Sequence, residues 1–158
     1  MSSPSEAFIA LTQQTGSIPE PTLRAAFEKL PAITDPAFLY GDWKGGSFEN
    51  DHPGHKMLAA MRWAGKNFRA VNDVDPIVVY DDQGKRVVSE AFGASAARLR
   101  KVELWGTLSV SMVYDKNPII DQFRWVGEDL VAGAMDVKPD EGRVYYFYLR
   151  RIKEGEKL

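Results

Sequence analysis

Two histidines, His52 and His55, are the side chains whose charge changes nearest to neutral pH, which makes them candidates for acid–base chemistry. They lie close together in the segment Asn50-Asp51-His52-Pro53-Gly54-His55. A metal bound there would have Asp51 as its third ligand, which fits none of the common zinc patterns. The pattern therefore favours a turn that caps a helix over a metal or catalytic site, and His55 stays the candidate general acid or base.

A second group of candidates consists of three aspartates, Asp115, Asp121 and Asp136, near the ends of expected strands. Asp121 lies two residues from both Ile119 and Phe123 and therefore shares their face of the strand, so we expect its side chain to point into the interior of the sheet. A buried carboxylate must be paired or neutral. Asp121 is therefore either half of a salt bridge that fixes strand pairing, which the pattern favours, or a general base or ligand anchor in a pocket.

The composition excludes several classes of protein. The chain has 158 residues and no cysteine, which excludes disulfides, a thiolate nucleophile and cysteine-ligated metals. Its 20 basic and 22 acidic residues leave a net charge of −2, without the basic stripe of a nucleic-acid binder. Phosphate-loop and serine-nucleophile motifs are missing, and two histidines without cysteine are too few for the common zinc sites, so we expect no cofactor and no metal. Without a signal peptide or an apolar run of about 18 residues, the sequence predicts a cytoplasmic protein that does not span a membrane.

Helices are predicted in the first part of the chain. Ser3-Pro4-Ser5-Glu6 has the form of a capping box and starts a helix that runs through Gln14. A second helix, which ends at Pro31, carries its apolar residues on one side. A third is expected over residues 53–64, with Gly65 as its C-terminal stop.

The rest of the chain predicts β-strands joined by short turns. The expected strands cover residues 38–48, 76–80, 86–89, 101–114, 119–126, 130–137 and 143–151. The last four follow one another through turns alone, which indicates an antiparallel meander. Because closure removes the free edges of such a sheet, we predict a mainly β protein with N-terminal helices, in which the meander closes into a small β-barrel.

Both faces of the late strands are rich in aromatic and apolar residues, and residues 144–149 are of these types at every position. One face should therefore pack against the helices or a second copy of the chain, and the other should line the barrel. The interior of an eight-stranded barrel is either filled with side chains or holds one small ligand. The expected ligand-binding residues are Tyr40, Trp43, Trp105, Met112, Tyr114, Phe123, Arg124, Met135, Tyr146 and Tyr148. Arg124 or a tyrosine hydroxyl would contact the polar group of the ligand.

Several motifs together resemble a known family. The segment Gly41-Asp42-Trp43-Lys44-Gly45-Gly46 resembles the signature of the small bacterial GXWXG family. The domain of unknown function that normally follows this signature is similar to residues 114–124, 133–136 and 146–149, and residues 65–68 and 97–100 also match the pair. The resemblance covers about residues 16–151, and its glycine-x-tryptophan motif is similar to the start of lipocalins.

The resemblance implies a calycin-like barrel in which the tryptophan of the motif meets an arginine from a late strand. Trp43 would then form a cation–π contact with Arg150 or Arg151. The expected organisation is a helical segment (residues 1–33), a barrel (34–151) and a solvated tail (152–158). The GXWXG part of the barrel would cover about residues 34–90, and the companion part about residues 91–151.

These observations lead to one main hypothesis and two alternatives. The main hypothesis is an intracellular protein that binds a hydrophobic or amphipathic small molecule, such as a lipid or fatty acid, in the barrel, which requires empty apolar space there. The first alternative is a small barrel enzyme that uses His55 and Asp121 as acid and base on an apolar substrate, which requires both side chains at one cavity. The second alternative is a structural homodimer with a filled barrel.

Overall fold

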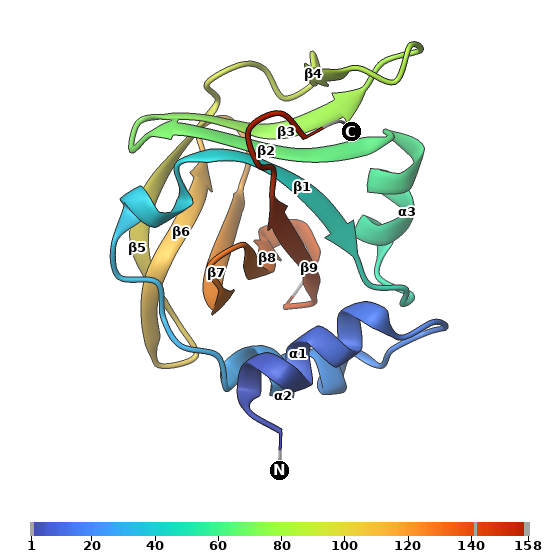
Figure 1. Ribbon diagram of the computed structural model, residues 1–158, viewed down its shortest axis with the longest axis vertical. Helices are drawn as coiled ribbons and strands as arrows, with labels where there is room; N and C mark the ends of the chain where they lie inside the picture. The colour runs from blue at the N-terminus through green and yellow to red at the C-terminus, as the bar shows by residue number, and fades with distance from the viewer. Residues whose placement is uncertain (1, 141, 157–158) are drawn as a thin grey trace.

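The computed structural model describes residues 2–140 and 142–156 and contains α-helices, β-strands and short 3₁₀ turns (Figure 1). The helices are α1 (Pro4–Gln13), α2 (Glu20–Glu28) and α3 (Pro53–Ala60), and the 3₁₀ turns are η1 (Pro36–Leu39) and η2 (Lys138–Asp140). The strands are β1 (Gly41–Ser47), β2 (Trp63–Ala70), β3 (Asp73–Tyr80), β4 (Arg86–Val88), β5 (Ala97–Leu104), β6 (Thr107–Tyr114), β7 (Ile119–Gly127), β8 (Leu130–Val137) and β9 (Val144–Arg151). Within the described ranges, no helix is both long enough and apolar enough to cross a membrane.

Eight of the described strands form a closed antiparallel barrel. Neighbours around the ring follow the order β1-β2-β3-β5-β6-β7-β8-β9, and β9 pairs with β1 to close it. The short strand β4 lies outside the ring and pairs with β3. The predicted mainly β fold with N-terminal helices is therefore confirmed, and the barrel is consistent with a calycin-like architecture.

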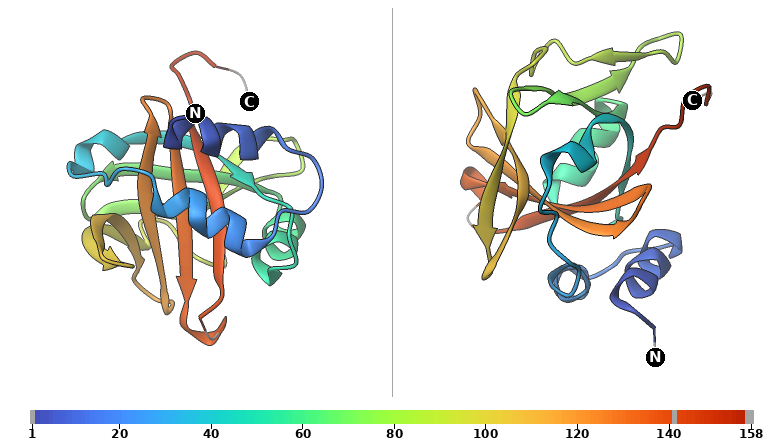
Figure 2. Two further views of the ribbon diagram at one scale, coloured as in Figure 1. Left: turned by 90° about the horizontal axis from the view of Figure 1, so that it is seen from below. Right: turned by 60° about the vertical axis from the view of Figure 1, so that its left-hand side comes forward.

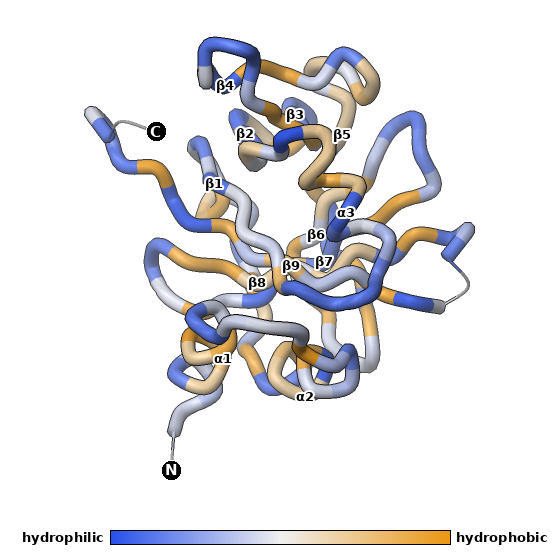
Figure 3. Tube along the Cα trace, turned by 90° about the vertical axis from the view of Figure 1, so that its right-hand side faces the viewer, coloured by the Kyte–Doolittle hydropathy of each residue, from blue (hydrophilic) through white to orange (hydrophobic). Residues whose placement is uncertain are grey.

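The predicted use of both sheet faces is also confirmed. Helices α1 and α2 pack across the outer face of β7, β8 and β9 (Figure 2), and their traces alternate between hydrophobic and hydrophilic residues (Figure 3). Phe8 and Phe27 anchor the two helices in an outer apolar cluster that also contains Tyr146 of β9. The apolar outer face of the late strands is thus covered by the chain's own helices. Helix α1 begins with the predicted capping box, formed by Ser3 and Glu6.

The third predicted helix is correct at its start and wrong at its end. We expected it over residues 53–64, but α3 stops at Ala60 and β2 begins at Trp63. Gly65 lies inside β2 and does not terminate the helix. A Cβ atom at Gly65 would lie 1.8 Å from the carbonyl oxygen of Trp43, so a side chain there would prevent β1 and β2 from pairing.

The tryptophan of the glycine–tryptophan motif lies inside the barrel. Trp43 is fully buried and donates a hydrogen bond from Nε1 to the carbonyl oxygen of Leu39, 2.7 Å away. The guanidinium carbon of Arg151 lies 4.3 Å from the centre of the Trp43 ring, so the predicted cation–π contact with a late-strand arginine is confirmed for Arg151. Gly45 leaves room for another ring, because a Cβ there would lie 2.5 Å from Trp63.

Candidate functional site

A small cavity lies inside the barrel and is lined in part by α3. Figure 1 shows α3 beside the barrel strands. The walls of the cavity are Met57 and Leu58 of α3, with Trp63, Lys66, Ile77, Phe92, Tyr114, Ile119, Asp121, Met135, Tyr145 and Phe147 from the barrel and its connections. The cavity volume is about 20 Å³. Because about 10–15 Å³ is enough for one water molecule, this cavity has room for one water. The remaining interior is filled by core side chains, among them Trp43, Phe68, Leu99, Val110, Met112, Phe123, Val131 and Leu149.

A lysine and an aspartate face each other in this cavity. Lys66 of β2 and Asp121 of β7 are 2% and 0% exposed, and Lys66 Nζ lies 3.2 Å from Asp121 Oδ2. The amine also donates a hydrogen bond of 2.8 Å to the carbonyl oxygen of Pro76, and Tyr114 Oη lies 3.5 Å from it. The rings of Trp63, Tyr114 and Phe147 surround the amine, with the Phe147 centre 5.3 Å away. The cavity thus combines an apolar wall with one charged pair.

The Asp121 carboxylate lacks directed hydrogen bonds. Its contact with Lys66 has the distance of an ion pair, but among the described residues neither carboxylate oxygen has a hydrogen-bond partner. Burial lowers the pKa of Lys66 and raises that of Asp121, and the attraction between the two groups opposes both shifts. Burial also raises the pKa of Tyr114, and the charge of Asp121 raises it further. Burial therefore brings the pKa values of the two groups closer together, and carboxylate oxygens of Asp121 line the cavity.

A chain of polar side chains leads from the cavity to α3. The Tyr145 hydroxyl donates a hydrogen bond to Ser47 Oγ at the end of β1, and Ser47 Oγ lies 2.6 Å from His55 Nδ1. His55 is half-buried in the first turn of α3 and does not line the cavity. Burial is the main reason that the pKa of Tyr145 is raised, so the hydroxyl keeps its proton.

The wall of the cavity nearest solvent is made of partly exposed apolar side chains. Met57 of α3 is 46% exposed, and Phe92 and Ile119 are half-buried, although all three line the cavity. Methionine is a flexible side chain that repacks readily. This part of the wall can therefore repack more readily than the fully buried core.

The candidate acid and base do not meet. Asp121 points into the interior as predicted and lines the cavity, whereas His55 contacts Ser47 outside it. The group opposite Asp121 is Lys66, so the favoured interpretation of Asp121 as half of a salt bridge is confirmed. The expected role of that bridge in strand pairing is wrong, because β2 and β7 are not neighbours in the ring. The capping interpretation is also confirmed, because His52 Nδ1 accepts a 3.0 Å hydrogen bond from the Gly54 amide at the start of α3.

Some of the expected ligand-binding residues lie inside the barrel. Tyr114 and Met135 line the cavity, while Trp43, Met112 and Phe123 belong to the filled part of the core. Met112 and Met135 are the register partners of Asp121 on the two neighbouring strands, so they place the carboxylate between two thioether side chains.

The other expected residues lie outside the barrel. Trp105, Tyr146 and Tyr148 pack in the outer apolar cluster, and Tyr40 is exposed. Arg124 is buried beneath the helices, where Nη1 donates hydrogen bonds to the carbonyl oxygens of Phe27, Glu28 and Leu30 near the end of α2. Gln122 and Arg124 lie on the opposite face of β7 from Asp121, so their side chains point out of the barrel. Arg124 is therefore not available to a ligand in the cavity.

Sequence reasoning missed Lys66 as a functional candidate. The signal that could have identified it is a single lysine between Ala64-Gly65 and Phe68, small and apolar residues that predict a buried strand. The regular alternation expected of a strand is interrupted at Gly65. Register shifts there place Trp63 and Lys66 on the same interior wall. A regular strand would have placed them on opposite faces.

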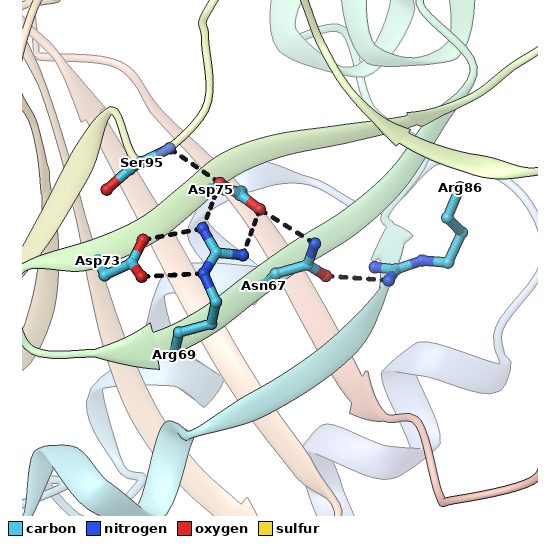
Figure 4. Close-up of polar contacts among 6 residues, drawn as sticks. All are labelled: Asn67, Arg69, Asp73, Asp75, Arg86 and Ser95. Carbon is cyan, nitrogen blue, oxygen red and sulfur yellow. Dashed lines mark hydrogen bonds and ion pairs between the residues drawn. The ribbon is translucent and has the colours of Figure 1, made fainter.

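A second polar cluster lies at the outside of the β2–β3 pair (Figure 4). It contains Asn67, Arg69, Asp73, Asp75, Arg86 and Ser95. Arg69 forms two hydrogen bonds of 2.7 Å with Asp75, and the Ser95 amide donates to the same carboxylate. These contacts join β2, β3 and the segment before β5, so we assign the cluster a structural role at the seam of the barrel.

Known proteins resemble this chain over almost its full length. The profile of the GXWXG protein family matches residues 25–84, and that of the domain of unknown function DUF4334 matches residues 95–151. A crystal structure of a protein from Thermomonospora curvata is 34% identical, has a TM-score of 0.88, and is matched over 96% of this chain and 100% of that one. Comparison with curated proteins gives no match. The chain therefore belongs to the GXWXG protein family, and its second half is a DUF4334 domain.

Proposed function

We propose that this protein binds a compact amphipathic molecule inside the barrel, with the polar group of the ligand at Lys66 and Asp121. The observation that carries the proposal is the Asp121 carboxylate, which is 0% exposed and, among the described residues, has Lys66 as its ion-pair partner and no further hydrogen bond, although it lines a cavity. A buried ion pair is a poor source of stability, because desolvation of the two charges offsets their attraction. Its position in a wall that is otherwise apolar supports a role in orienting a ligand once the cavity has enlarged to admit one.

The size of the cavity favours a compact ligand over a long acyl chain. A cavity of about 150 Å³ is needed for a benzene-sized ring, whereas this one has about 20 Å³. Binding therefore requires Met57 and Phe92 to move outward. A fatty acid would require further displacement of core side chains such as Met112 and Phe123, which are buried in the filled part of the interior. Within the expected class of hydrophobic or amphipathic ligands, we therefore favour small cyclic or branched molecules.

Intrinsic fluorescence tests this proposal, because Trp63 lines the cavity whereas Trp105 lies in the outer cluster. We expect benzyl alcohol to change the emission of the protein in a saturable way, with an affinity in the range of about 10 μM to 1 mM. Trp63→Phe should abolish the signal, and Trp105→Phe, the matched control, should keep it. A fluorescent long-chain fatty acid should bind more weakly or not at all.

Two results bear directly on the proposal. Mass spectrometry of the gently purified protein should detect a compact co-purifying molecule or an empty protein, and a bound fatty acid would show that the barrel opens further than we propose. If neither benzyl alcohol nor cyclohexanol, phenol or benzaldehyde binds, the proposal is wrong.

A further inference from the structure

We propose that Lys66 is a nucleophilic amine that condenses with a small apolar aldehyde or ketone, and that Asp121 serves as the acid and base of this condensation. This inference rests on the proposed function, because it uses the same cavity, and it adds the chemical class of the ligand and a covalent step. Its basis is the position of the amine, which lines the cavity 3.2 Å from a carboxylate without other hydrogen bonds.

The environment of Lys66 differs from that of the other described lysines. Lys66 is 2% exposed, whereas the remaining lysines in residues 2–140 and 142–156 are all exposed. Exposed lysines are strongly hydrated ammonium ions, and an ammonium ion has no lone pair with which to attack a carbonyl carbon. Burial in an apolar pocket favours the neutral amine and is one of the established ways to activate a lysine.

The charges of the pair select the class of ligand. A carboxylate ligand would place a second anion beside Asp121, and an amine ligand would place a second cation beside Lys66. An alcohol could donate to Asp121 but would make no use of the amine as a nucleophile. A neutral carbonyl compound uses both groups, because its carbon accepts the amine lone pair while its oxygen accepts a proton from the carboxyl group.

The condensation balances within the cavity. It starts with transfer of one proton from the Lys66 ammonium to the Asp121 carboxylate, 3.2 Å away, which gives a neutral amine and a protonated carboxyl. The amine attacks the carbonyl carbon, the C=O π electrons move to oxygen, and Asp121 protonates that oxygen. Asp121 then removes one proton from the nitrogen, which gives a carbinolamine. Finally the C–O bond breaks, the hydroxyl leaves as water with the proton from Asp121, and the nitrogen lone pair forms the C=N bond of a cationic iminium.

The product preserves the electrostatics of the resting site. The iminium carries one positive charge and Asp121 one negative charge, so the ion pair is restored with carbon attached to its nitrogen. The distance of 3.2 Å between Lys66 Nζ and Asp121 Oδ2 lies within the reach required of a general acid or base. A single water molecule is released in this step.

Reductive trapping tests the inference. The protein is incubated with a low concentration of benzaldehyde and sodium cyanoborohydride, which reduces an iminium to a stable secondary amine, and the product is mapped by peptide mass spectrometry. We expect Lys66 to acquire the benzyl group about tenfold faster than any exposed lysine. Benzyl alcohol, added as a competitor, should protect Lys66 and leave the exposed lysines unaffected.

Variants separate the covalent step from folding and from binding. Asp121→Asn should slow the labelling of Lys66 at least about tenfold, because the amide cannot exchange a proton with the intermediate. Lys101→Met, which removes an exposed lysine of β5, should leave it unchanged. Circular dichroism of each variant establishes that the barrel is folded. The peptide map of the unaltered protein tests the selective labelling of Lys66 without any variant.

The outcomes are distinguishable from those of the proposed function. Benzaldehyde, acetone and cyclohexanone are each used as the carbonyl compound in the trapping experiment. If benzyl alcohol changes the Trp63 emission but none of the three labels Lys66 faster than the exposed lysines, the covalent step is overturned and the binding proposal stands. If no compact molecule binds and Lys66 is not labelled, both proposals fail. Selective labelling of Lys66 that depends on Asp121 supports both.

Discussion

Lys66 and Asp121 join opposite sides of the barrel. Their strands, β2 and β7, are separated by β1, β9 and β8 in one direction around the ring and by β3, β5 and β6 in the other, yet Lys66 Nζ lies 3.2 Å from Asp121 Oδ2. The long side chain of the lysine crosses the interior to reach the carboxylate. The pair therefore links strands that share no backbone hydrogen bonds, and it does so beside the cavity.

Removal of the lysine alone should be costly. Lys66→Met leaves the buried Asp121 carboxyl without its cation, and we expect the free energy of unfolding at pH 7 to fall by about 3–5 kcal/mol. The loss should shrink as the pH is lowered. Burial already places the pKa of Asp121 above its unfolded value, and a protonated carboxyl carries no charge to compensate. Urea unfolding at several pH values measures both effects.

The matched double variant separates loss of a partner from loss of packing. Lys66→Met combined with Asp121→Leu replaces the pair with apolar groups, and we expect its stability to lie within about 2 kcal/mol of the unaltered protein. A double variant as unstable as Lys66→Met would contradict the view that the uncompensated charge is what destabilises the single variant.

The hydroxyl chain between the cavity and α3 gives a second prediction. Ser47→Ala removes the acceptor of the Tyr145 hydroxyl, and we expect a loss of about 1–3 kcal/mol, because a buried donor is left unpaired. Adding Tyr145→Phe to this variant should restore part of the loss. The control is Ser17→Ala at an exposed position, expected to change stability by less than about 0.5 kcal/mol. Chemical denaturation curves decide, and a full loss in the double variant would argue against the pairing.

The close approach at Gly45 predicts a specific steric effect. A Cβ at this position would lie 2.5 Å from the ring of Trp63, so Gly45→Ala must displace that ring from the cavity wall. We expect a loss of about 1–3 kcal/mol and a change in near-ultraviolet circular dichroism. Gly127→Ala is the matched control, because nothing lies within 4 Å of the added atom. Equal effects of the two changes would refute the steric explanation.

Asp75 should make the protein less stable in acid. Burial alone would raise its pKa, but hydrogen bonds from Arg69, the Ser95 amide and Asn67 outweigh that effect and lower it. An acid with a lowered folded pKa adds stability that is present above the unfolded value of about 3.9 and is lost as the pH falls through the folded value.

The variant that checks this is Asp75→Asn. At pH 7 we expect it to be about 1–3 kcal/mol less stable, because a charged hydrogen-bonded partner of Arg69 is lost. The difference from the unaltered protein should narrow as the pH falls below about 4, where the aspartate is protonated as well. Urea midpoints at pH 7, 5 and 3 give the comparison, and a constant difference would count against a lowered pKa.

Much of the barrel could be predicted where its strands are regular. The single strand expected over residues 101–114 is wrong, because it is two strands, β5 and β6, joined by a turn in which Trp105 and Gly106 have positive φ. The alternation of Ile119, Asp121 and Phe123 on β7 assigned the inward face correctly, and unbroken apolar runs such as residues 144–149 indicated that both faces are covered. The resemblance to barrels with the same motif predicted the contact of Trp43 with a late-strand arginine, which Arg151 makes. Periodicity is a reliable signal where the backbone repeats without interruption.

The site itself could be predicted only in part. The sequence predicts Asp121 as a candidate but does not predict its partner, Lys66. Contacts across the interior depend on how the ring closes, and no local sequence pattern indicates them. Gly65 was interpreted as a helix stop, although its role is to let β1 and β2 approach each other. Arg124 was expected to contact the ligand, but it faces α2. The sequence could not distinguish these two sides of the strand, because both are surrounded by apolar residues.

The position of β4 outside the ring affects how copies of the protein meet in a concentrated solution. Ring strands have neighbours on both sides, although β3 and β5 pair only at Val74 and Ala97. Within the described residues the free edges are therefore the three-residue strand Arg86–Val88, next to the charged Lys85, and the part of β5 that carries Arg100 and Lys101. Short edges that carry positive charge are poor templates for adding a strand from another molecule. The fold should therefore resist edge-to-edge aggregation even though its sequence is rich in aromatic and β-branched residues.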